Sequence, residues 1–244
     1  MKVALCLYGQ PRHINNPYTW LSHKYHIIDK YKTDIFIHTW ISGAKKEFEY
    51  SDWVNIEKRN AVESENASNL ILKKYNPKKY IFEPPRFFSL DENSKITIKE
   101  KEKEYLKIWN GDFNWSENNE NNTLSQLYSL SKSVELIDAQ YDWIILSRYD
   151  NYIYDFPNLY QLEKDNLYLD NKFIYNFSDV LIVGGQKQIE TLNCFDKIPE
   201  LCEKISYFTP EEFKRVAFQM KYKEKRIRIG VAIARTDSLE KMQY

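Results

Sequence analysis

The first half of the chain alternates short apolar runs with longer amphipathic stretches. Residues 3–8 form a continuous apolar run that Gly9 and Pro11 close, which is typical of a strand buried on both faces. Three later apolar runs predict further strands, at residues 34–40, 79–82 and 142–147. Because strands that alternate with helices are joined by crossover connections, this order predicts a parallel α/β sheet.

Helical patterns separate these strands. Asn16 fits the N-cap position and Pro17 the first position of a helix after the first strand. Apolar spacing predicts two more helices, at residues 62–75 and 95–109. A fourth helix is expected to start at Thr123 or an adjacent residue, with Leu124, Leu127, Leu130 and Val134 on its core face. The Gly/Asn/Glu-rich stretch 110–122 before it is expected to be a loop and is a candidate lid.

The pattern changes beyond residue 150. Strands are predicted at 167–169, 179–183 and 226–234, and helices at 186–195 and 210–223. We therefore expect one fused domain with two portions: a mostly parallel half, residues 1–150, and a mixed half, residues 151–244.

Composition excludes several classes of protein. With 244 residues, 43% hydrophobic and 29% charged, the chain is not expected to be disordered. Its 35 basic and 35 acidic residues cancel, so no global field favours nucleic acid. No apolar run is long enough for a signal peptide or a membrane span, which predicts a cytoplasmic protein with at most peripheral membrane contact. Cys6, Cys194 and Cys202 lack the number and spacing of a disulfide framework or a zinc site.

Ligands of open α/β sheets bind at the carboxyl ends of the strands, so the residues there are the first candidates. The first strand ends in Tyr8, Gly9, Gln10 and then, beyond a proline, Arg12. Glycine lets a ligand approach the backbone, and a guanidinium suits phosphate. The structural alternative is a strand-to-helix turn with a solvated arginine. Neither a dinucleotide-binding glycine motif nor a P-loop occurs.

The second strand ends in three hydrogen-bonding side chains, His38, Thr39 and Trp40. A lone histidine is more often structural than catalytic, and Trp40 could stack on a base or cap the core. No other histidine stands at metal-ligand spacing from His38, which argues against a histidine metal site.

The fourth strand gives the strongest indication of chemistry, because it delivers Arg148 and Asp150 together at its end. An aspartate there can hold Mg²⁺ or Mn²⁺, which neutralises a leaving diphosphate, and Arg148 can contribute charge directly. The structural alternative is an Arg–Asp pair that stabilises a loop.

Several short segments of the chain resemble GT-A-type nucleotide-sugar glycosyltransferases, particularly those of surface-polysaccharide gene clusters. The similarity lies in residues 4–12 (ALCLYGQPR), 34–40 (DIFIHTW), 126–129 (QLYS), 143–150 (WIILSRYD), 179–184 (DVLIVG) and 210–212 (PEE). The resemblance implies a Rossmann-like GT-A fold, a nucleotide-sugar-binding first half, an acceptor-binding second half and an Asp-x-Asp motif that holds a divalent metal. Here Arg148 stands where the first aspartate is expected, so Asp150 is left as the metal ligand, with Mn²⁺ or Mg²⁺.

The acceptor side offers weaker candidates. Asp179 could act as the base that deprotonates an acceptor hydroxyl, or be a turn residue at a strand start. Glu212 could do the same, or form a capping box with Thr209. Gln126 and Ser129 lie off the core face of their helix and could meet the donor or solvent. The basic cluster 221–228 could attract a lipid-linked acceptor or be solvated surface.

The sequence thus favours a glycosyltransferase that moves a sugar from a nucleoside diphosphate to an acceptor hydroxyl on a glycan or a lipid-linked molecule. Two alternatives stay open. One is a nucleotidyl- or phosphosugar-transferase on a related scaffold, and the other is a non-catalytic carbohydrate-binding protein.

Overall fold

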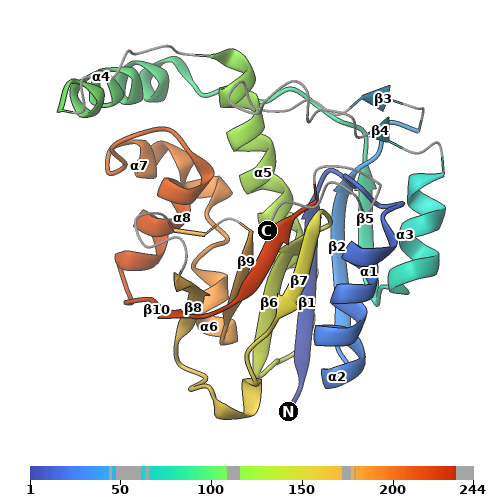
Figure 1. Ribbon diagram of the computed structural model, residues 1–244. Coiled ribbons are helices and arrows are strands. Elements are labelled where there is room, and N and C mark those ends of the chain that lie inside the picture. Colours follow the sequence, from blue (N-terminus) through green and yellow to red (C-terminus); the bar gives the residue numbers. More distant parts are fainter. Residues whose placement is uncertain are drawn as a thin grey trace.

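A mixed, mostly parallel sheet forms the centre of the protein (Figure 1). The computed structural model describes residues 1–43, 46–47, 62–63, 66–108, 116–171, 177–178 and 180–234. Within these residues the sheet has seven strands in the order β10-β8-β9-β6-β1-β2-β5. Every neighbouring pair is parallel except the two pairs that involve β9. The prediction of a mostly parallel sheet flanked by helices is confirmed.

The strand bounds agree closely with the apolar runs. The strands of the sheet are β1 Val3–Gly9, β2 Asp34–Trp40, β5 Lys79–Glu83, β6 Trp143–Arg148, β8 Leu167–Asp170, β9 Leu181–Gly184 and β10 Lys225–Ile227. The strand predicted at 179–183 is β9; its first residue lies outside the described residues and its regular part begins at Leu181.

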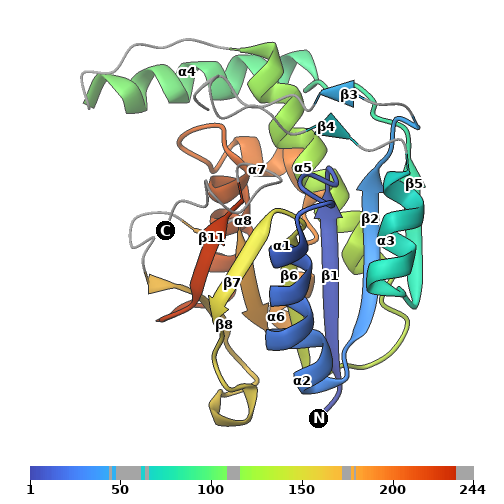
Figure 2. The ribbon, with the colours of Figure 1, turned by 45° about the vertical axis from the view of Figure 1, so that its right-hand side comes forward.

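A small second sheet was not predicted. Strand β7 (Asn151–Asp155) pairs antiparallel with β11 (Gly230–Ile233), and both lie on the same side of the main sheet as α1 (Figure 2). The prediction of one strand over 226–234 is therefore wrong, because β10 and β11 belong to different sheets. At the bend, Gly230 lies so close to Tyr154 that an added Cβ would come within 2.5 Å of that ring. Only glycine permits this approach.

The structure also corrects a helix start. The helix predicted over 62–75 begins only at Ala67 and is α3 (Ala67–Tyr75), because β4 (Val62–Glu63) pairs with β3 (Lys46–Glu47). Two-residue strands carry no apolar period of their own, so the pattern could not separate them from the helix that follows.

The first helix begins as predicted: the Asn16 side chain accepts a hydrogen bond from the Tyr18 N–H at 2.9 Å, and Pro17 occupies the first turn. It runs without a break through α1 (Pro17–His23), the π-helical η1 (Lys24–Ile28) and α2 (Asp29–Tyr31). The remaining helical segments are α4 Glu92–Ile108, α5 Glu117–Glu135, η3 Leu159–Gln161, α6 Gln186–Glu190, η5 Phe195–Lys197, α7 Ile198–Cys202 and α8 Pro210–Gln219.

Helix α5 starts six residues before Thr123, so the loop expected over 110–122 is wrong for 117–122. Ser116 caps the helix by accepting a hydrogen bond from the Asn119 N–H. The negative charges of Glu117 and Glu120 stabilise the positive end of the helix dipole. Residues 110–115 of the candidate lid lie outside the described residues.

Helices predicted in the second half end earlier than expected. The one at 186–195 stops at Glu190, and the one at 210–223 stops at Gln219. Helix α7 was not predicted.

Alternate side chains of β1 enter two different cores, which explains its unbroken apolar run. Val3, Leu5 and Leu7 pack with residues of α1–α3 and β7, such as Ile27, Ile71 and Ile153. Ala4, Cys6 and Tyr8 pack on the other face with α5, α6 and α8, including Leu130, Ile189 and Phe218. A third cluster joins α5, α7 and α8, and it contains Cys194 and Cys202.

All three cysteines are free and buried, and burial raises the pKa of Cys194 and of Cys202 to about 12. Among the described residues, no helix combines the length and the apolar character that crossing a bilayer requires.

Candidate active site

The carboxyl ends of β1, β2, β5 and β6 meet at one edge of the sheet, the upper edge in Figure 1. From β1 the chain continues to β2 and β5 on one side, and β6 lies on the other side. The connections thus diverge between β1 and β6, which is where open α/β sheets bind ligands. Tyr8 pairs with Arg148 across this point, so the sequence candidates after β1 and β6 are neighbours.

Gly9 ends β1 in a conformation that favours glycine, with φ +92°. Its N–H donates to Ser129 Oγ of α5 at 2.7 Å, and its carbonyl accepts from Thr39 Oγ1 at 2.5 Å. A Cβ added here would meet no atom within 4 Å, so the backbone is open on that side. The predicted close approach of a ligand at Gly9 is therefore sterically possible.

The turn after Gly9 is held by its own side chains. Arg12 Nε donates to Gln10 Oε1 at 2.9 Å, and the Arg12 N–H donates to the Gln10 carbonyl at 2.8 Å. His13 next to it has φ +55° and is buried. The Arg12 charge contributes to lowering the pKa of Asp150, less than the charge of Arg148 does.

Arg148 and Asp150 form a bidentate ion pair. Arg148 Nε donates to Asp150 Oδ1 at 2.9 Å, and Nη2 donates to Oδ2 at 2.6 Å. The Asp150 side chain is 3% exposed and the Arg148 side chain 17%. Burial alone would raise the pKa of Asp150, but Arg148, then Arg12 and His13, lower it below its usual value. The carboxylate is thus ionised and covered, and the guanidinium is the group nearer to solvent.

These contacts do not fit a resident divalent cation. Both oxygens of Asp150 already accept from Arg148, and Mg²⁺ in proteins usually takes one or two carboxylates of its own. A cation on this carboxylate would lie close to the guanidinium, where even two unit charges about 4 Å apart repel by about 4 kcal/mol. No group of three or more His, Cys, Asp or Glu side chains that could hold a metal occurs in the described part of the chain.

A buried hydrogen-bond network that the sequence analysis missed lies beneath the Arg148–Asp150 turn. His23 Nδ1 lies 3.1 Å from the Tyr75 hydroxyl, and His23 Nε2 lies 3.0 Å from Ser147 Oγ. Asn151 Nδ2 donates both to Ser147 Oγ at 2.8 Å and to the Val180 carbonyl at 2.6 Å. Burial lowers the pKa of His23 to about 4. A neutral imidazole with its proton on Nε2 satisfies all these contacts.

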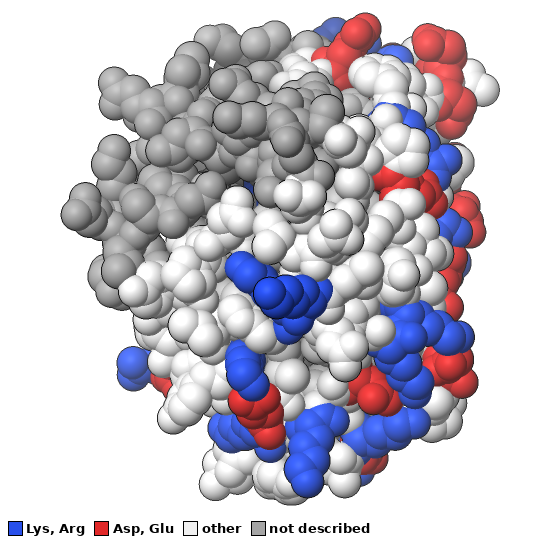
Figure 3. All heavy atoms as spheres, turned by 90° about the vertical axis from the view of Figure 1, so that its right-hand side faces the viewer, with Lys and Arg blue, Asp and Glu red and all other residues white. Residues whose placement is uncertain are grey.

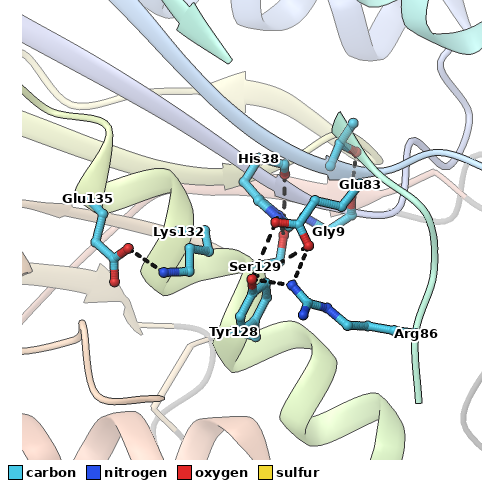
Figure 4. Close-up of polar contacts among 9 residues, drawn as sticks. Gly9, His38, Glu83, Arg86, Tyr128, Ser129, Lys132 and Glu135 are labelled. Carbon is cyan, nitrogen blue, oxygen red and sulfur yellow. Dashed lines mark hydrogen bonds and ion pairs between the residues drawn. The ribbon is translucent and has the colours of Figure 1, made fainter. Parts of the chain in front are cut away.

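His38 is buried and structural in its contacts, as the commoner alternative predicts. Its Nδ1 lies 2.7 Å from Ser129 Oγ, and its Nε2 lies 3.6 Å from Glu83 Oε1 (Figure 4). Burial lowers the pKa of His38 to about 4, although Glu83 opposes the shift. Through Ser129, His38 is linked to the Gly9 N–H, so it supports the end of β1 from β2.

Trp40 caps the core at the end of β2. Its ring is 3% exposed and stacks on Tyr128, with 5.5 Å between the ring centroids. Arg86 covers the Tyr128 ring at 4.4 Å and also bonds the Tyr128 hydroxyl and the Glu83 carboxylate (Figure 4). The sequence analysis did not find Glu83 and Arg86, although Glu83 stands at the carboxyl end of a predicted strand.

The remaining donor candidates lie around this edge. Thr39 bonds the Gly9 carbonyl, as described above. Gln126 is half-buried on α5, one turn before Ser129. Ser129, expected with Gln126 to lie off the core face, is instead fully buried, and its side chain contacts Gly9 and His38.

Glu212 lies in the first turn of α8, three residues after the cap. Its N–H donates to Thr209 Oγ1 at 3.3 Å, which confirms Thr209 as the N-cap of α8. Its buried carboxylate accepts two bonds of 2.6 Å from Arg215 and one of 3.2 Å from the Ser206 N–H. The other acceptor candidate, Asp179, lies outside the described residues.

The basic cluster 221–228 is partly neutralised by acidic neighbours. Lys225 pairs with Glu163 at 2.5 Å and Arg228 with Asp155 at 3.3 Å. Arg226 pairs with Glu224 of the cluster itself at 3.4 Å. On the face shown in Figure 3, acidic and basic side chains lie side by side along the lower and right-hand parts, and a small group of Lys or Arg side chains lies near the centre among uncharged residues.

Comparison with known proteins gives no family for the chain. No protein-family model matches it, and no curated protein matches it either.

Proposed function

We propose that the protein is a glycosyltransferase that moves a sugar from a nucleoside diphosphate to an acceptor hydroxyl. The observation that carries the proposal is the buried Arg148–Asp150 pair beside the open backbone of Gly9, at the point between β1 and β6 where the connections diverge, with Arg12 in the turn that follows β1. Such a site suits an anionic ligand that lies against the backbone.

The fold supports the same proposal. The resemblance implies a nucleotide-binding first half of Rossmann type, and β1, β2, β5 and β6 are parallel neighbours in that half. It also implies a mixed second portion, and β9 enters the sheet antiparallel. We therefore assign the chain to the GT-A type as part of the proposal.

In the proposed reaction, the acceptor hydroxyl oxygen attacks the anomeric carbon of the donor sugar. The bond from this carbon to the diphosphate oxygen breaks, the nucleoside diphosphate leaves with the electron pair, and the acceptor proton passes to a base. Negative charge grows on the leaving diphosphate, and Arg12 and Arg148 stabilise it there. The ends of β1 and β2 are proposed to hold the nucleoside.

The partners follow from the resemblance. We propose a nucleotide-sugar donor, a glycan or lipid-linked acceptor and a cytoplasmic site of action. The resemblance also implies Mn²⁺ or Mg²⁺ at Asp150, but since the contacts of that carboxylate do not fit a cation, no step above depends on one.

A thermal-shift panel tests the proposal. Ligands that bind the folded chain raise its melting temperature, so at least one of UDP, GDP, CDP and ADP, or a sugar derivative of it, should do so. Asp150→Ala should then abolish sugar transfer in a folded chain, whereas Asp29→Ala, which removes an exposed surface carboxylate, should not. Absence of any shift would favour a carbohydrate-binding protein, and a phosphodiester product would favour the nucleotidyl- or phosphosugar-transferase.

A further inference from the structure

The Arg148–Asp150 pair presents its positive side to a ligand. Asp150 is almost fully buried, and both of its oxygens are occupied by Arg148, which is the more exposed partner. A ligand that reaches this turn from solvent therefore meets a guanidinium before it meets a carboxylate. The planar fork of a guanidinium matches phosphate oxygens with parallel N–H donors.

A second arginine follows the strand that pairs with β6: Tyr8 of β1 pairs with Arg148, and Arg12 stands four residues later in the turn, with its Nε bonded to Gln10 Oε1. The Arg12 charge, from the turn after β1, favours the ionised form of Asp150, as does the Arg148 charge from the end of β6. These three side chains together carry one net positive charge. A diphosphate between the ends of β1 and β6 would gain from this charge, whereas a divalent cation would be repelled by it.

Resting on the function proposed above, we infer that Arg148, with Arg12, takes the role of the divalent cation, so that the donor diphosphate binds to the protein without metal. Asp150 then acts as a positioning residue: its carboxylate fixes the plane of the Arg148 guanidinium. On this inference, the Arg-Tyr-Asp sequence neutralises the diphosphate with a guanidinium, whereas an Asp-x-Asp motif does so with a bound metal ion.

Calorimetric titration of the full chain with UDP, GDP, CDP and ADP, in EDTA and in MnCl₂, tests the inference. For whichever diphosphate binds, we expect affinities in the two conditions to agree within about threefold. Binding that disappears in EDTA would overturn the inference and leave the proposed function standing. Absence of binding in both conditions would instead count against the proposed function itself.

Two variants make the test specific. Arg148→Gln combined with Asp150→Asn removes both charges, so that no buried carboxylate is left unpaired, and we expect the affinity in EDTA to fall at least about tenfold. Arg148→Asp places two carboxylates around Tyr149, and its binding should now depend on Mn²⁺. Wild-type affinity of either variant in EDTA would overturn the inference.

A control variant separates local from general charge effects. Lys164→Gln removes a cation that pairs with Asp142 at the opposite edge of the sheet, just before β6. It should bind the diphosphate as the wild type does. Circular dichroism and the melting temperature of each variant confirm that the comparison is between folded chains.

Discussion

Asn151 reaches back across the Arg148–Asp150 turn to hydrogen bond with Ser147, with 2.8 Å between Nδ2 and Oγ. Ser147 precedes Arg148 and Asn151 follows Asp150, so this bond closes the turn from beneath. The same Asn151 amide bonds the Val180 carbonyl, and His23 bonds Ser147 from the other side. The turn that carries the two charged residues is thus held by buried neutral groups.

Removing the Asn151 side-chain hydrogen bonds should affect both the stability of the protein and its affinity for a nucleoside diphosphate. Asn151→Ala leaves the buried Val180 carbonyl without its amide donor and takes one of two donors from Ser147 Oγ, which keeps His23, so we expect the free energy of unfolding to fall by about 1–3 kcal/mol. The affinity for a nucleoside diphosphate should fall as well, because the turn loses its fixed shape. Urea denaturation and calorimetry measure the two effects. Asn166→Ala, which removes an amide that donates to the exposed Glu163 carboxylate, should change neither.

The stability of the protein should decrease in mild acid because of its two buried histidines. The pKa values of His23 and His38 are both about 4 in the folded chain, against an ordinary value of about 6.5. Between these values the unfolded chain binds protons that the folded chain does not. Stability is therefore complete above about pH 6.5 and falls toward pH 4, by at most about 1.4 kcal/mol per pH unit for each histidine.

Denaturation curves at several pH values check this expectation. In His23→Gln, which retains a hydrogen-bonding side chain at the position, the dependence on pH between 4 and 6.5 should be roughly halved. An unchanged slope in this variant would show that His23 does not cause the acid sensitivity.

The hydrophobic pattern was sufficient to predict the strands in the parallel half of the sheet. Residues 34–40 form β2 as predicted, and Asn16 and Pro17 start α1 as predicted, because a long apolar strand and a side-chain cap are local features. Strand β7 was missed because its five residues alternate tyrosine with short polar and apolar side chains and follow β6 after only two residues. Its partner β11 is about 75 residues away in the chain, beyond any local pattern.

Gly9→Ala offers a test of ligand approach at the end of β1. An alanine there must adopt φ near +92°, which costs about 1–2 kcal/mol of stability, and its methyl group projects into the open side of the backbone. We expect lower stability together with weaker nucleoside diphosphate binding. Gly43→Ala is the matched control for strain, since Gly43 also has a positive φ and open space at its Cβ position.

The outcome depends on the difference between these two variants. Both should lose stability by a similar amount in thermal denaturation, and only Gly9→Ala should lose affinity. Equal affinity in the two variants and the wild type would remove Gly9 from the binding site.

The cap of α8 can be tested separately from the site. Thr209→Ala removes the side-chain acceptor for the Glu212 N–H, which should lower the free energy of unfolding by about 1 kcal/mol. Since this cap stabilises α8 alone, affinity for nucleoside diphosphates should stay at the wild-type value. Loss of binding without loss of stability would instead indicate that this helix end belongs to the ligand site.

The sequence alone could predict only part of the candidate site, and the reason is physical. Arg148 and Asp150 are separated by a single residue and stand at a strand end, so their pairing could be anticipated. His23, Ser147 and Asn151 come from three different elements, and each is an ordinary polar residue in its own segment. Their roles depend on burial and on contact between distant segments, which local patterns do not encode.

The buried cysteines make the protein convenient for site-directed labelling. Cys6, Cys194 and Cys202 are all buried in the packed interior, so thiol-reactive dyes will not modify them in the folded protein under mild conditions. A single cysteine introduced at an exposed position such as Tyr25, which is 75% exposed, would then be the only reactive thiol. Fluorescent probes can thereby be attached one position at a time without first replacing any natural residue.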